Sequence, residues 1–115
     1  MRTGLALAFV LLLVGSAAAQ DRRGIRFWNL TTNTVKEFYL SPAGKDEWGP
    51  NQCKNDKDGE VDHDERLRIV GIEAGRYDAK LADVRGRVCV VRNIDIKAAA
   101  VFTIEEKQLT ECTRK

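Results

Sequence analysis

The sequence lacks the patterns by which most enzymes are recognised. It has a single histidine, no Cys-x-x-Cys pair, no Gly-x-Ser-x-Gly elbow, no P-loop and no dinucleotide fingerprint. A Ser–His–Asp arrangement would have to use His63, which lies between two aspartates. We therefore expect a protein that is not an enzyme, with a small hydrolytic enzyme as the alternative.

Neither sign of charge is in large excess. The 115 residues are 43% hydrophobic and 31% charged, with a formal net charge of +2. A nearly balanced chain has no global field that would draw it to nucleic acid or to anionic lipid. We expect neither as a partner of the mature chain. Its length suits one domain with a modest core.

Only one long apolar run occurs, Leu5 to Val14, and it is short for a membrane span. Arg2 precedes it, and Ala17-Ala18-Ala19 follows as a small-residue cleavage site. This order is that of a secretory signal peptide. We predict a signal peptide over residues 1–19, a single mature domain over 20–115, and a periplasmic or secreted location; an uncleaved anchor is the alternative.

Helical periodicity is scarce in the mature chain, and short segments of β-type sequence follow one another between turn residues. The pattern predicts an all-β fold, a small antiparallel immunoglobulin-like β-sandwich of six to seven strands. The alternation breaks near Val90-Val91, where we expect a bulge. Of Phe27 and Trp28, we expect the larger ring to face the core. The expected strands are 25–31, 35–41, 66–72, 75–83, 85–97 and 100–106.

Three cysteines remain after export, so an oxidising compartment favours one disulfide and one leftover thiol. A hairpin turning at Lys97–Ala99 would bring Cys89 and Cys112 together. We predict the disulfide Cys89–Cys112, although spacing alone leaves Cys53 as another possible partner. The polar tail Thr110–Lys115 should fray unless Cys112 holds it.

Six carboxylates crowd the segment from Asp56 to Glu65. A calcium loop of the EF-hand kind has ligands at places one, three, five, seven, nine and twelve around a glycine at place six. With Gly59 at place six, five of the six ligand places match. The predicted metal ligands are Asp56, Asp58, the carbonyl of Glu60, Asp62 and Glu65.

The first place of this loop is Lys54, which would repel Ca²⁺, and the flanking sequences are not helical. Only a similar loop set between strands could therefore bind calcium, and weakly. The alternative is a solvated acidic hairpin, since Asp58-Gly59 is a turn signal by itself.

The second unusual segment is Lys45–Asn51, a run of turn-forming residues around Trp48. With Tyr39, Trp48 could form an aromatic binding surface for a sugar ring or a protein partner. In the alternative, Trp48 folds back and closes the end of the sandwich.

Four short motifs recur in a group of small exported bacterial β-proteins that has no assigned activity. They are Asn-x-Thr at Asn29–Thr31, Tyr-x-Ser-Pro at Tyr39–Pro42, Trp48-Gly49 and Tyr77-Asp78. The chain resembles this group over Phe27–Ile96. The resemblance implies the fold and export, and no activity.

Together these features predict an exported, non-enzymatic binding or structural protein with calcium as its only candidate cofactor. The alternative is a periplasmic inhibitor or adaptor that binds a larger, unidentified protein through its loops, above all Lys45–Asn51.

Overall fold

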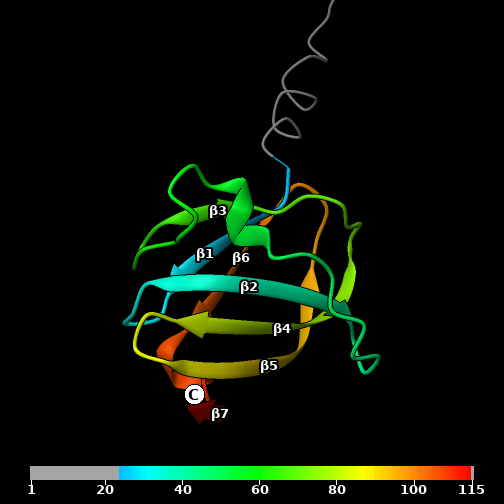
Figure 1. Cartoon of the computed structure of the whole chain (residues 1–115). Coiled ribbons are helices and arrows are strands. Elements are labelled where there is room, and N and C mark those ends of the chain that lie inside the picture. Colours follow the sequence, from blue (N-terminus) through cyan, green and yellow to red (C-terminus); the bar gives the residue numbers. More distant parts are fainter. Residues whose placement is uncertain (1–23, 115) are drawn as a thin grey trace, which may run out of the picture.

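The computed structural model describes residues 24–114, so the predicted signal peptide lies outside the described residues. Two short 3₁₀ helices interrupt a chain of strands (Figure 1). The strands are β1 Arg26–Leu30, β2 Val35–Pro42, β3 Arg66–Arg68, β4 Gly75–Asp83, β5 Arg87–Ile96, β6 Val101–Glu105 and β7 Glu111–Arg114; the 3₁₀ helices are η2 Gln52–Asn55 and η3 Glu106–Gln108.

The strands form two sheets, which confirms the predicted all-β sandwich. One sheet has the order β3-β1-β6 and the other β2-β4-β5-β7. A division into three and four strands is that of a constant-type immunoglobulin domain. Four of the five strand pairs are antiparallel, but β1 and β6 run parallel, with Arg26 opposite Val101 and Leu30 opposite Glu105.

Three phenylalanines join the two sheets. Phe27 of β1 stacks on Phe38 of β2, with 4.2 Å between ring centroids, and Phe102 of β6 lies 5.7 Å from Phe27. The expectation that Trp28 faces the core was wrong. Trp28 lies on the outer face, where its Nε1 donates to Asp64 and Arg66 covers its ring. Phe27 faces inward because a phenyl ring has no N–H group that would need a hydrogen-bond partner inside the sandwich, whereas the indole of Trp28 does.

The predicted bulge exists but lies slightly later than expected. The register of β4 against β5 shifts between the pairs Tyr77–Ile94 and Ala79–Val91. Two residues of β5, Arg92 and Asn93, therefore stand opposite the single residue Asp78 of β4, and Asn93 has a positive φ of 60°. Asparagine tolerates that conformation better than valine does, so the bulge forms there.

The disulfide Cys89–Cys112 is present as predicted, but the hairpin expected to bring the two residues together is not. The segments on either side of Lys97–Ala99, β5 and β6, belong to different sheets. The cysteines meet because the tail forms β7, which pairs with β5 so that Cys89 stands opposite Cys112. The disulfide is compatible with an exported protein. In residues 24–114 no helix is long and apolar enough to cross a membrane.

Removing this disulfide should lower the free energy of unfolding substantially, because the unfolded chain gains conformational entropy when the cross-link is lost. Every residue of β7 is exposed, so little packing holds this strand in place without the disulfide. The cysteines are 23 residues apart in sequence. For a loop of this length the chain-entropy estimate is about 3 kcal/mol. We expect Cys89→Ala/Cys112→Ala to lose about that free energy of unfolding in urea titrations. A reductant should destabilise the wild type to the same level and leave the double variant unchanged; equal stability of the oxidised proteins would contradict this.

Candidate functional site

The first half of the acidic loop is a hydrogen-bonded turn. Asp56 accepts the N–H of Asp58 through its Oδ2 at 2.9 Å, and its carbonyl accepts the N–H of Gly59. Glu60 is exposed, whereas Val61 is buried and bridges to Val35 of β2. Val61 therefore anchors the loop in the core.

The second half of the loop is held by its own carboxylates. Asp62 accepts the hydroxyl of Thr34 at 2.9 Å, and Glu65 accepts the N–H of Asp62 at 2.8 Å. The Nδ1 of His63 donates to the carbonyl of Thr31 at 2.7 Å, which holds the imidazole against the turn that follows β1.

Among residues 24–114 no three His, Cys, Asp or Glu side chains lie close enough together to hold a metal ion. The oxygens of Asp56, Asp62 and Glu65 already accept hydrogen bonds from the protein. These contacts favour the acidic turn over the calcium loop, and calcium binding stays a prediction.

The structure brings the two predicted aromatic residues to the same lysine. The Nζ of Lys80 lies 4.8 Å from the ring centroid of Trp48 and 5.6 Å from that of Tyr39. Trp48 therefore covers the outer face of the four-stranded sheet and does not close the end of the sandwich.

A groove of about 550 Å³ opens at the end of the sandwich where β2 ends and β4 begins. Residues from the segments 42–52 and 70–73 form its two sides. Its walls are mainly apolar, with two exposed carboxylates at the edge. The lining residues are Leu40, Pro42, Glu47, Gly49, Pro50, Gln52, Val70, Gly71, Ile72, Glu73 and Tyr77.

Hydrogen bonds hold both walls of this groove. Buried Gln52 accepts the N–H of Val70 at 3.0 Å and donates to its carbonyl at 2.9 Å. The Tyr77 hydroxyl donates to the carbonyl of Glu73, and the N–H of Gly49 donates to Leu40. The groove is thus pre-formed, as ligand sites usually are.

Gly49 and Pro50 belong to the loop predicted from the sequence as a binding surface, whereas the opposite wall was not predicted. The strand expected over 66–72 ends at Arg68, so residues 70–73 are free to form that wall. Gly71, with a positive φ of 81°, was the available signal for a turn there.

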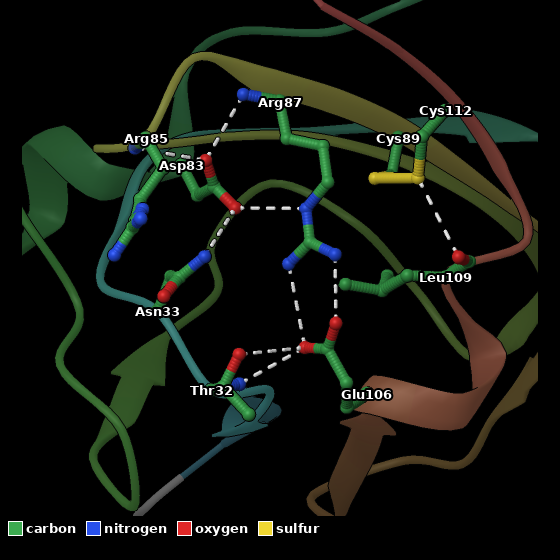
Figure 2. The surroundings of a disulfide bond; sticks show 9 residues. All are labelled: Thr32, Asn33, Asp83, Arg85, Arg87, Cys89, Glu106, Leu109 and Cys112. Atoms are coloured by element: carbon green, nitrogen blue, oxygen red, sulfur yellow. Dashed lines mark hydrogen bonds and ion pairs between the residues drawn. A yellow bond between two sulfur atoms is a disulfide. The ribbon is translucent and has the colours of Figure 1, made fainter.

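At the opposite end of the sandwich, where β4 ends and β5 begins, Arg87 forms ion pairs with Asp83 and Glu106 (Figure 2). Burial opposes ionisation of Asp83, but hydrogen bonds from Asn33 and from Arg87 outweigh it, so the pKa of Asp83 lies below its ordinary value. The Arg87 guanidinium, together with the N–H of Thr32, lowers the pKa of Glu106 to about 2.

A second buried carboxylate lies beneath the 43–48 segment. Burial again opposes ionisation of Asp78, but the backbone N–H groups of Gly44 and Asn93 and the side chain of Arg92 lower its pKa. Asp78 is only 2% exposed, because the 43–48 segment covers it. Asp78 and Asp83 each accept hydrogen bonds from the backbone of neighbouring loops and so stabilise them. Neither residue lines the groove.

Cys53 is the free cysteine and lies buried in the core. Burial, followed by the nearby carboxylate of Asp56, raises the pKa of its thiol to about 12. Its Sγ contacts the carbonyl of Val35. A thiol held protonated in this way is a poor nucleophile.

The Arg87–Glu106 pair predicts a specific acid sensitivity. The pKa of Glu106 is about 2 in the folded chain against an ordinary 4.5, so its stabilising effect is complete above pH 4.5 and is lost as the pH falls toward 2. Glu106→Gln should lower the urea midpoint at neutral pH and flatten its decline across that range. The exposed Glu60→Gln should keep the wild-type profile, and matching profiles for both variants would contradict the prediction.

The acidic loop predicts a negative result in thermal melts. We expect the melting temperature to be the same with millimolar Ca²⁺, with Mg²⁺ and with chelator, because Asp56, Asp62 and Glu65 each already accept a hydrogen bond from the chain and no three acidic side chains of residues 24–114 converge on one point. A rise specific to Ca²⁺ that Asp58→Asn or Glu65→Gln abolishes and Lys54→Asp enhances would instead support a weak calcium loop.

Comparison of the chain with family models, with curated proteins and with solved structures finds no match. The resemblance to small exported bacterial β-proteins stays a prediction carried by its motifs.

Proposed function

We propose that this chain is an exported, non-enzymatic binding protein, and that its groove receives a segment of a protein partner that combines an apolar side chain with lysine or arginine. The observation that carries the proposal is the pre-formed apolar groove with Glu47 and Glu73 at its edge. It supports the inhibitor or adaptor interpretation of the loops more than a purely structural role.

The apolar walls supply the attraction. Val70 is one of two large hydrophobic side chains that remain clearly exposed among the described residues, at 40% exposure. Its backbone is clamped by Gln52, so covering Val70 would cost little conformational entropy. Burying apolar area contributes roughly 25 cal/mol per Å².

The two carboxylates supply selectivity. Neither Glu47 nor Glu73 takes part in an ion pair between residues 24 and 114. A cation placed at the edge of the groove would therefore meet two uncompensated negative charges. Complementary charge at the edge of an interface speeds association and rejects acidic partners.

Selection from a displayed library of random peptides tests this function. Peptides enriched on the wild-type protein should combine a leucine-like side chain with lysine or arginine. Val70→Asp should weaken binding of a selected peptide at least about tenfold, as is typical when a central interface residue is lost. Glu47→Gln/Glu73→Gln should weaken it less and reduce its dependence on salt.

Val84→Asp is the matched control, since Val84 is 49% exposed but lies in the turn between β4 and β5, away from the groove. It should bind the selected peptides as the wild type does. Enrichment of acidic peptides, or equal binding by Val70→Asp and Val84→Asp, would contradict the proposal.

A further inference from the structure

The outer face of the four-stranded sheet carries an aromatic–lysine cluster, composed of Tyr39, Trp48 and Lys80. Tyr39 of β2 stands directly opposite Lys80 of β4 in the sheet register. The residues beside Trp48 are both attached to β2: Glu47 N–H donates to the Ser41 hydroxyl at 2.8 Å, and Gly49 N–H donates to the Leu40 carbonyl. Trp48 is thereby placed over the sheet surface.

A small hollow of about 190 Å³ lies beside this cluster. Ala82 and Val88, which pair across β4 and β5, provide small apolar surfaces in its lining. Leu81 also lies at the hollow, but its side chain is buried in the core. Tyr39 and Glu37 also line the hollow, and the Tyr39 hydroxyl donates to the Glu37 carboxylate at 3.1 Å. The hollow thus combines a fixed aromatic ring, an apolar surface and the negatively charged acceptor of Glu37, which suits hydroxyl groups and keeps a ligand carboxylate on the Lys80 side.

The Lys80 ammonium supplies a positive charge to the same hollow. Within residues 24–114 no carboxylate lies within ion-pair distance of it. Its contacts are with the faces of Trp48 and Tyr39, which attract a cation but do not neutralise it. The two rings therefore position a charge that an anion could still pair with.

We propose that this hollow binds an acidic sugar, a pyranose ring that carries a carboxylate. The C–H face of the ring packs on Tyr39 and the apolar lining, and its hydroxyls donate to Glu37. Its carboxylate pairs with Lys80, and Trp48 acts as a positioning residue for that ammonium. Because this site and the groove have different lining residues, the inference does not depend on the proposed peptide binding.

Titration of the isotope-labelled protein with D-glucuronate, D-glucose and acetate tests the site by NMR. Glucuronate should shift the Trp48 indole and the amides of Tyr39 and Lys80 in a saturable way, with at least fivefold tighter binding than glucose. Acetate should cause no saturable shift. Equal effects of glucuronate and acetate would reduce the site to a simple anion contact and overturn the proposal.

Variants then separate the roles. Lys80→Gln should weaken glucuronate binding at least fivefold and leave glucose binding unchanged, while Lys80→Arg should retain most of the glucuronate affinity. Lys36→Gln removes the same charge from an exposed position of β2 outside the hollow and should change nothing. Val70→Asp should also bind glucuronate normally. A Lys80→Gln protein that melts like the wild type and binds glucuronate equally well would overturn the inference.

Discussion

The stacking of Phe27 on Phe38 across the two sheets is the contact on which the rest of this molecule depends. It places one ring from β1 and one from β2 in the centre of the core, where Phe102 of β6 also packs. Because side chains alternate along a strand, an inward Phe38 turns Glu37 and Tyr39 outward. The same contact that joins the sheets therefore also decides which residues the outer face of β2 presents.

Buried polar side chains then shape the ends of the sandwich. At one end Gln52 holds the backbone of Val70, and Asp78 holds the N–H groups of Gly44 and Asn93. At the other end Asp83 and Arg87 tie the turn between β4 and β5 to Glu106 (Figure 2). A buried polar group is tolerated only when it is hydrogen-bonded, so these residues specify single loop conformations. Rigid loops of this kind make suitable walls for a binding groove.

The segment between β2 and η2 serves two faces of the molecule. Glu47, Gly49 and Pro50 line the groove, while Trp48 between them covers the outer face beside Lys80. Its backbone is attached to Ser41 and Leu40 of β2, which leaves it little freedom to rotate. The groove and the hollow beside Lys80 can therefore exist side by side without sharing a lining residue.

The sequence by itself determined the all-β class and the approximate positions of the first six strands, because alternation and turn residues are local signals. It left the partner of Cys89 open, and the pairing with Cys112 follows from the tail forming β7 beside β5. Tertiary structure alone decided that β5 and β6 lie in different sheets, that Phe27 and not Trp28 faces inward, and that Asp78 is covered. It likewise decided the groove, whose walls are separated in the chain and meet only when Gln52 reaches Val70. Local patterns encode which face of a strand is apolar, but which distant segment covers that face depends on long-range packing, and no short stretch of sequence contains that information.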